Sequence, residues 1–237
     1  MSVWELLFPK KCILCGSILQ KGDYGVCAEC RSKLPVIREP RCLHCGKPME
    51  SVRQEYCPGC AGRVSSLDGG ITLWEYTDSM RRVMADFKYG GCESDAVFFA
   101  DEFAAYHSQK LQDWNIQAIV PVPLHWRKRW FRGYNQAESF ACALGQKLSV
   151  PVYTNVLRRI RYTEPQKGLD SRQRRKNLQG AFDAVKNAED RINNCVTILL
   201  VDDIYTTGAT LEACAGVLRR LGVQRVYFTC LCTGRAL

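Results

Sequence analysis

The sequence predicts an α/β fold, with a mostly parallel sheet and flanking helices, preceded by a small cysteine-rich module. Two observations support this prediction. Four Cys-x-x-Cys pairs lie within the first 60 residues, and strand-like and helix-like segments alternate through the rest of the 237-residue chain. Such alternation is typical of α/β domains. Because the composition changes abruptly after Cys60, we expect the module to occupy residues 1–66 and the α/β domain residues 67–237.

Composition and charge narrow the class of protein. With 46% hydrophobic and 24% charged residues the chain can form a packed core. No apolar run approaches the roughly 20 residues that a membrane helix needs, and the first nine residues contain neither a basic leader nor a long apolar stretch. We therefore expect a cytoplasmic protein without membrane insertion. The net charge of +9 favours anionic ligands such as nucleotides, pyrophosphate or nucleic acid, although solubility alone would also explain it.

The cysteine pairs form an internal repeat with a period of 30 residues, and eleven residues separate the two pairs of each copy. Without an export signal this pattern favours metal ligation over disulfides, and four thiolates at about 2.3 Å form a closed, structural zinc site. The simplest assignment is one Zn²⁺ per copy, with the ligands Cys12, Cys15, Cys27 and Cys30 and the ligands Cys42, Cys45, Cys57 and Cys60. Cross-braced ligation, in which alternate pairs share a metal, stays open, and iron–sulfur ligation fits the spacing less well. Gly16 and Gly46 follow the first pair of each copy, where a tight knuckle needs a residue that tolerates positive φ.

Beyond a linker over residues 62–70, we expect strands and helices to alternate. The expected strands span residues 71–76, 118–122, 152–157, 181–185, 196–201 and 226–231. The expected helices span residues 79–87, 97–111, 136–148 and 209–221, with a loop before the third. In such folds ligands collect at the carboxyl ends of the strands, so the loops that follow strands are the expected sites.

The most informative loop follows the expected strand over residues 196–201. It starts with Asp202 and Asp203 and continues through Thr-Thr-Gly-Ala-Thr into a helix. Backbone N–H groups at the start of that helix can hold a phosphate, with threonine hydroxyls as further donors and Gly208 allowing close approach. The two carboxylates can accept hydrogen bonds from ribose hydroxyls. We therefore predict a sugar-phosphate site here, which a closed turn with both aspartates in a buried salt-bridge network would contradict.

Two further loops are rich in basic residues. Residues 121–136 follow a strand and carry four of them, and residues 161–177 form a long polar loop suited to closing over an anionic substrate. Taken alone, either segment would also suit an ordinary solvated loop.

The segment over residues 198–211 resembles the phosphoribosyl pyrophosphate signature of type I phosphoribosyltransferases, in which a hydrophobic strand leads into two acids and Thr-Thr-Gly-Ala-Thr. The resemblance implies that Asp202 and Asp203 hold the 2′ and 3′ hydroxyls of the ribose. It also implies that the 5′-phosphate is bound by Thr206, Thr207, Gly208, Ala209 and Thr210.

Together with the cysteine repeat, several motifs resemble the ComF family of competence-associated proteins, which includes GntX-type members. These motifs are Phe87-Lys88-Tyr89-Gly90, Val120-Pro121-Val122-Pro123-Leu124, Arg129-x-x-Arg132-Gly133-Tyr134-Asn135-Gln136, Thr163-x-x-Gln166 and Arg172-x-x-x-x-Asn177. The resemblance covers essentially the whole chain. It implies a type I phosphoribosyltransferase-like domain behind a double zinc ribbon, with a role in natural competence through uptake or use of external DNA. It does not establish a catalysed reaction.

A catalytic domain of this kind would displace pyrophosphate at C1 of the ribose, with Mg²⁺ bridging the pyrophosphate and ribose oxygens. The expected catalytic residues are Asp202, Asp203, Arg129 and Arg132. The two arginines and Lys88 are expected to grip pyrophosphate, because guanidinium binds phosphate in a bidentate way. Further expected substrate-binding residues are Pro121, Val122, Pro123 and Arg172. The sequence identifies no acceptor nucleophile and no general base, so whether turnover occurs stays open.

A second hypothesis is a non-catalytic adaptor that handles DNA and keeps a regulatory or vestigial phosphoribosyl pyrophosphate site. Basic residues of the cysteine-rich module and of residues 158–175 would then face a phosphate backbone. Trp126, Trp130 and Phe131 lie among basic residues, where they would stack on bases or pack inside the fold. The partners in this hypothesis are single-stranded DNA or competence proteins, and the sequence does not predict the oligomeric state.

Overall fold

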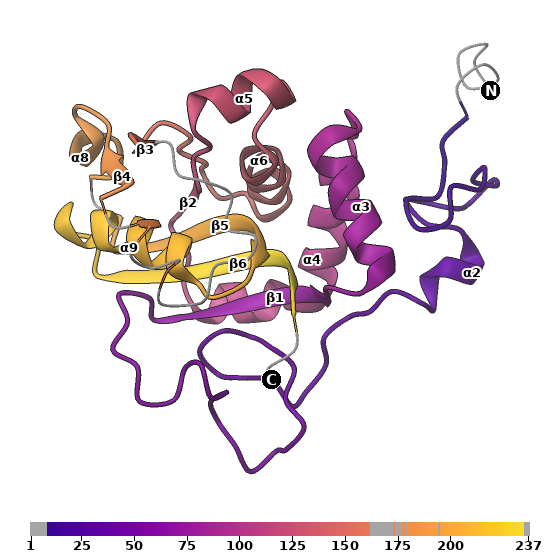
Figure 1. The fold of residues 1–237 in the computed structure, drawn as a ribbon, viewed down its shortest axis with the longest axis horizontal. Coiled ribbons are helices and arrows are strands. Elements are labelled where there is room, and N and C mark those ends of the chain that lie inside the picture. Colours follow the sequence, from indigo (N-terminus) through magenta and orange to yellow (C-terminus); the bar gives the residue numbers. More distant parts are fainter. Residues whose placement is uncertain (1–8, 162–172, 174–176, 179, 194, 235–237) are drawn as a thin grey trace.

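A four-stranded parallel sheet forms the centre of the fold (Figure 1). The structure is a computed structural model, and it describes residues 9–161, 173, 177–178, 180–193 and 195–234. The strands are β1 (Gly69–Glu75), β2 (Ala118–Pro121), β5 (Thr197–Tyr205) and β6 (Arg225–Thr233), in the order β1-β6-β5-β2 across the sheet. All neighbouring pairs are parallel, which confirms the predicted mostly parallel sheet.

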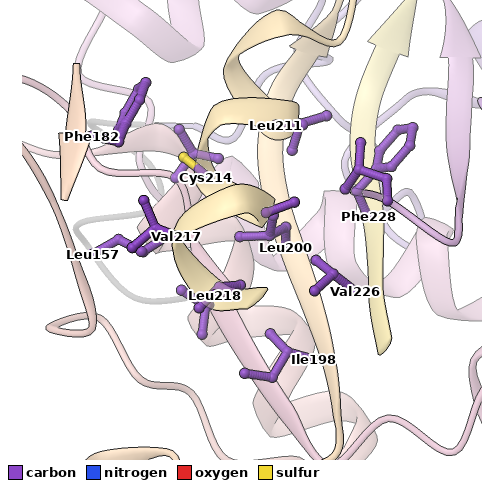
Figure 2. Packing of buried hydrophobic residues seen from close by; sticks show 14 of the residues in the cluster. Leu157, Phe182, Ile198, Leu200, Leu211, Cys214, Val217, Leu218, Val226 and Phe228 are labelled. Carbon is purple, nitrogen blue, oxygen red and sulfur yellow. The ribbon is translucent and has the colours of Figure 1, made fainter. Parts of the chain in front are cut away.

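Helices cover both faces of this sheet. The helices that cover it are α3 (Asp78–Tyr89), α4 (Asp95–Asp113), α6 (Gln136–Leu148) and α9 (Ala209–Arg220). The shorter helices of the described residues are α2 (Ala28–Arg31), α5 (Trp126–Arg132) and α8 (Ala188–Arg191). Because successive strand residues point to opposite faces, Leu199 of β5 packs with α3, α4 and α6, whereas Ile198 and Leu200 pack with α9. Figure 2 shows this second side, where α9 covers Ile198, Leu200 and Val226. The sheet is therefore the middle of three layers.

Local sequence explains where these helices begin and which face they bury. The Thr77 hydroxyl accepts a hydrogen bond from Met80 N at 3.4 Å and caps α3, and the Asn135 side chain accepts one from Ala137 N at 3.3 Å and caps α6. The face of α3 that the sequence predicts to be apolar is buried, through Met80, Val83, Met84 and Phe87. No helix in the described part of the chain has the length and apolar character needed to cross a membrane.

The predicted strand over residues 152–157 is wrong. Only Val152 pairs with β2, through an isolated bridge, after which a turn at residues 154–155 leads the chain away. Threonine and asparagine at these two positions favour a turn over a continued strand. The strand that follows is β3 (Leu157–Arg159), which pairs antiparallel with β4 (Phe182–Ala184) in a separate two-stranded sheet.

Two further elements differ from the predicted ones: a helix that was not predicted and a strand that is longer than predicted. The segment expected as a loop before α6 contains α5, which His125 caps and Gly133, at a φ of 82°, ends. The α5 sequence consists of basic and aromatic residues and buries none of them, so this short helix has no core-facing side of the kind that hydrophobic periodicity predicts. Strand β5 continues past the expected end at residue 201 to Tyr205, so Asp202 and Asp203 lie within the strand and not in a loop.

The two cysteine-rich copies dock on different parts of the α/β domain. In the first copy, Cys12 and Cys30 share a buried cluster with Phe98 of α4. In the second copy, Cys45 belongs to the cluster that contains Phe228 of β6. Figure 1 shows the first copy, with α2, at one end of the molecule and the second copy beside β1.

Candidate functional site

A cavity of about 500 Å³ lies at the carboxyl ends of β2 and β5. Ligands of open α/β sheets bind at this edge. Among the described residues, the charged side chains that line the cavity are Lys47, Lys88, Lys128, Arg132, Arg159, Asp202 and Asp203. The excess of five cations over two carboxylates in this set favours an anionic ligand.

Asp202 and Asp203 lie near the end of β5, opposite the last turn of α3. Asp203 Oδ2 is 2.8 Å from Nζ of Lys88, and Asp203 N donates to Asp202 Oδ1 at 2.9 Å. Burial and the neighbouring Asp203 carboxylate raise the pKa of Asp202 to about 7. Burial disfavours the charge on Lys88, but the two carboxylates outweigh it, and the pKa of Lys88 is raised. Negative charge is therefore crowded at the acids, and Lys88 stays protonated beside them.

The ion pair between Lys88 and Asp203 does not close the site. The two side chains keep 19% and 18% of their surface exposed, and Thr206, three residues beyond Asp203, is exposed. A buried network under a closed turn would contradict the predicted sugar-phosphate site. Instead, Asp203 is paired in the wall of an open cavity.

The turn between β5 and α9 has the geometry of a phosphate-binding helix start. Gly208 is the N-cap residue, with a φ of 73°, and among the described residues no side chain caps this helix. A Cβ atom at Gly208 would lie 2.8 Å from the Tyr205 hydroxyl oxygen, so the position needs glycine. The buried hydroxyl of Thr207 has no hydrogen-bond partner within the described part of the chain, and Thr206 and Thr210 line the cavity. Uncapped amides and threonine hydroxyls are donors that suit a phosphate.

The cations of the cavity come from the second cysteine-rich copy, α3, α5 and β3, and they lie close enough to repel one another. Arg132, in the last turn of α5, donates to Gln136 Oε1 at 2.9 Å and to the Tyr89 hydroxyl oxygen at 3.0 Å. Burial, followed by the charges of Arg159 and of the other cations, lowers the pKa of Lys128. A bound polyphosphate would relieve this repulsion.

The structure brings most of the expected binding residues together. Those that line the cavity are Lys88, Val122, Pro123, Arg132, Asp202, Asp203, Thr206 and Thr210. Four more expected residues lie beside the cavity. Thr207 and Gly208 form the turn before α9, Ala209 is the first residue of α9, and Pro121 is the last residue of β2. Arg129 is not among the lining residues, because it pairs with Glu138 at 2.9 Å and lines a separate hollow with it. Arg172 lies outside the described residues, as do Thr163 and Gln166.

Three lining cations were not expected at the site. Lys128 lies on α5, and the basic composition of that segment was its only signal in the sequence. Arg159 ends β3, which begins where the predicted strand ends. Lys47 belongs to the second cysteine-rich copy, and only the docking of that copy brings it to the cavity.

The eight paired cysteines form two groups of four, one in each copy of the repeat. Within each group the four sulfur atoms lie within 4.8 Å of one another, which confirms the sequential assignment and excludes the cross-braced one. The Sγ atoms of Cys15 and Cys27 are 3.8 Å apart, and those of Cys45 and Cys57 are 3.7 Å apart. Tetrahedral Zn–S bonds of about 2.3 Å place neighbouring sulfurs about 3.8 Å apart. Both groups therefore fit Zn²⁺.

Comparison with known proteins agrees with both halves of this architecture. Residues 3–61 match the double zinc ribbon domain, and residues 135–237 match the phosphoribosyl transferase domain. Over 232 residues the chain is 31% identical to Competence protein F of Haemophilus influenzae, covering 92% of this chain and 95% of that protein. The chain belongs to the ComF family.

Other relatives of this ComF-family chain are similar over most of their length. Competence protein ComFC of Bacillus subtilis is 29% identical over 228 residues, which cover 89% of each chain. DNA utilization protein YhgH of Escherichia coli is 27% identical over 230 residues, which cover 96% of this chain and 98% of that protein. The predicted fold, a phosphoribosyltransferase-like domain behind two four-cysteine groups, is confirmed.

Proposed function

We propose that the cavity binds phosphoribosyl pyrophosphate together with Mg²⁺, and that the protein serves natural competence or the use of external DNA in the cytoplasm. The ligand is supported by two adjacent acids that lead into an uncapped helix start, with five cations around them. The biological role is supported by the names Competence protein F and DNA utilization protein YhgH of its relatives. Thiols arranged as metal ligands support a reducing compartment.

Each part of the ligand meets a different part of the wall in this proposal. Asp202 and Asp203 accept hydrogen bonds from the 2′ and 3′ hydroxyls of the ribose. The amides and hydroxyls of residues 206–210 donate to the 5′-phosphate. Lys88 and Arg132 approach from α3 and α5 and hold the pyrophosphate through charge-assisted hydrogen bonds.

The donor set also fits Mg²⁺, which prefers carboxylate, phosphate and water oxygens. Burial, followed by the neighbouring Asp203 carboxylate, raises the pKa of Asp202, and a bound cation would favour the charged form of both acids. These two carboxylates would hold the ion, and the bound ion would neutralise part of the charge on the pyrophosphate. We propose binding and not transfer, because the acids, amides and cations account for the ribose and phosphates but leave an acceptor undefined.

Isosteric removal of the two acids tests the ribose contacts. In the double variant Asp202→Asn/Asp203→Asn, we expect the affinity for phosphoribosyl pyrophosphate to fall about tenfold, because charge-assisted hydrogen bonds to the sugar are lost. Without Mg²⁺, which these carboxylates would hold, the affinity for pyrophosphate should stay the same or rise, because two negative charges leave the cavity. Isothermal titration calorimetry measures phosphoribosyl pyrophosphate with Mg²⁺ and pyrophosphate without it.

A second adjacent acid pair provides the control. Glu189→Gln/Asp190→Asn removes the same charge from exposed positions on α8 and should change neither affinity. A folded Asp202→Asn/Asp203→Asn variant that binds phosphoribosyl pyrophosphate as tightly as the wild type would contradict the ribose contacts.

A second candidate function is binding of single-stranded DNA by α5. The exposed fraction is 66% for Trp126, 86% for Trp130 and 78% for Phe131, and no residue of α5 is buried. Exposed aromatic rings among basic side chains can stack on bases while the cations contact the phosphates. Large apolar side chains that are exposed together on one short helix mark a surface suited to binding.

The α5 proposal is tested by fluorescence anisotropy with labelled oligothymidylate at physiological salt. We expect Trp130→Ala to weaken binding about tenfold, because stacking contributes about 1–3 kcal/mol per base. Tyr106→Ala is the control, since it removes an aromatic ring that is 51% exposed on α4. Unchanged binding by Trp130→Ala, or no binding by the wild type, would argue against a DNA contact at α5.

A further inference from the structure

The second cysteine-rich copy reaches into the ligand cavity. Lys47 lines the cavity, and its Nζ atom lies 5.7 Å from the centroid of the Tyr205 ring. Tyr205 ends β5 directly before the phosphate-binding turn, and its ring stacks on that of Phe228, with centroids 5.1 Å apart. Within the described residues, the first copy contributes nothing to the lining of this cavity.

The residue before Lys47 fixes its position. Gly46 has a φ of 69°, and a Cβ atom there would lie 2.9 Å from Thr72 N and 3.0 Å from Ile71 Cα. The knuckle therefore lies directly on the backbone of β1, where no larger residue fits. The carbonyl of Lys47 accepts a hydrogen bond from Cys42 N at 2.9 Å, which ties it to the metal-binding cysteines. The backbone of Lys47 is therefore held between the cysteine site and the backbone of β1.

The segment that follows the second copy also contacts the phosphate-binding turn, from the side away from the cavity. Arg63 Nη1 donates to the Thr207 carbonyl at 3.3 Å, and Arg63 Nη2 lies 3.5 Å from Glu212 Oε2. Glu212, in the first turn of α9, also accepts hydrogen bonds from Ser65 Oγ at 2.7 Å and from Ser66 N at 2.6 Å. The segment that leaves the second copy is therefore attached to the turn and to the start of α9.

We propose that Lys47 is a ligand-binding residue, supplied by the second copy, that contacts the 5′-phosphate of the ligand. This inference rests on the proposed function of the cavity. It follows from the place of Lys47 over Tyr205, beside the turn that offers its amides to that phosphate. The matching position of the first copy, 30 residues earlier, is Ser17, so the lysine is not a feature that the zinc knuckle itself requires.

Binding of three ligands, two with a 5′-phosphate and one without, tests whether Lys47 contacts that phosphate. We expect Lys47→Met to bind phosphoribosyl pyrophosphate with Mg²⁺, and ribose 5-phosphate, about tenfold more weakly, because one charge-assisted hydrogen bond is lost. Its affinity for inorganic pyrophosphate should be little changed. Lys47→Arg should restore most of the loss, since it keeps the charge. The control is Lys21→Met, which removes an exposed lysine of the first copy and should leave all three affinities unchanged.

The possible outcomes distinguish this inference from the proposal on which it rests. A wild-type protein that binds no phosphoribosyl pyrophosphate would overturn both. If the wild type binds and Lys47→Met binds equally well, only the role of Lys47 is wrong. Equal weakening for all three ligands, or a lower melting temperature with unchanged affinities, would mean that Lys47 only packs on Tyr205, and it would overturn the contact with the 5′-phosphate.

Discussion

The two copies of the cysteine repeat share their local geometry but have different neighbours. In each copy an antiparallel bridge closes the knuckle at matching positions, and the four sulfur atoms gather in the same way. The first copy is attached to α4 by a buried apolar cluster with Phe98 and by polar contacts, in which Tyr24 donates to Asp101 at 2.7 Å and Arg31 pairs with Glu102. The second copy lies on the sheet and borders the ligand cavity.

This difference shows that two metal sites with the same local geometry can be coupled to the rest of the fold to different extents. Cys15 of the first copy is exposed, whereas the matching Cys45 is fully buried in the core that contains Phe228. A zinc ion in the first copy would stabilise a small module on the surface. A zinc ion in the second copy would also stabilise the contact of that copy with the sheet and, in our proposal, the position of Lys47.

The largest expected effect comes from breaking each metal site at the same position of the repeat. Cys57→Ser and Cys27→Ser each remove one zinc ligand, and a structural zinc contributes on the order of 10 kcal/mol to the folding of its own module. If only about 4 kcal/mol of this reaches the sheet, Cys57→Ser should lower the melting temperature of the α/β domain by roughly 10 °C. Cys27→Ser should lower it by a small fraction of that.

Near-ultraviolet circular dichroism follows the melting of the α/β domain in both cysteine variants. Zinc content, measured after denaturation, provides the control, because each variant should lose one ion per chain. Equal changes in melting temperature would show that the second copy is no more closely coupled to the sheet than the first.

Much of this architecture could be predicted from local sequence. The buried strands read as continuous apolar runs, and the acids that follow the run at residues 198–201 lie in the cavity wall. The structure groups the cysteines as in the simplest assignment, although their spacing alone left cross-braced ligation open, and the positive φ of Gly16 and Gly46 followed from the knuckle. These features depend on residues close together in the chain, which is why patterns could reveal them.

The features that could not be predicted depend on tertiary contacts. Arg159 and Lys47 lie at the cavity because β3 and the second copy dock there, and neither residue belongs to a motif. Helix α5 was missed because it has no buried face. Arg129 was expected at the site because a guanidinium group suits pyrophosphate, yet it pairs with Glu138 instead.

The smallest expected effect compares the two knuckle glycines, which occupy matching positions with φ values of 76° and 69°. An alanine at either position pays the same backbone strain, about 1–2 kcal/mol. Around Gly16 no atom lies within 4 Å of an added Cβ, so Gly16→Ala should cost only that strain.

At Gly46 the Cβ would meet Thr72 N at 2.9 Å, and backbone atoms of a central layer cannot move aside as a side chain would. We therefore expect Gly46→Ala to lower the free energy of unfolding by about 3 kcal/mol in urea denaturation, because overpacking adds to the strain. Equal losses for the two variants would mean that the second copy does not rest rigidly on β1.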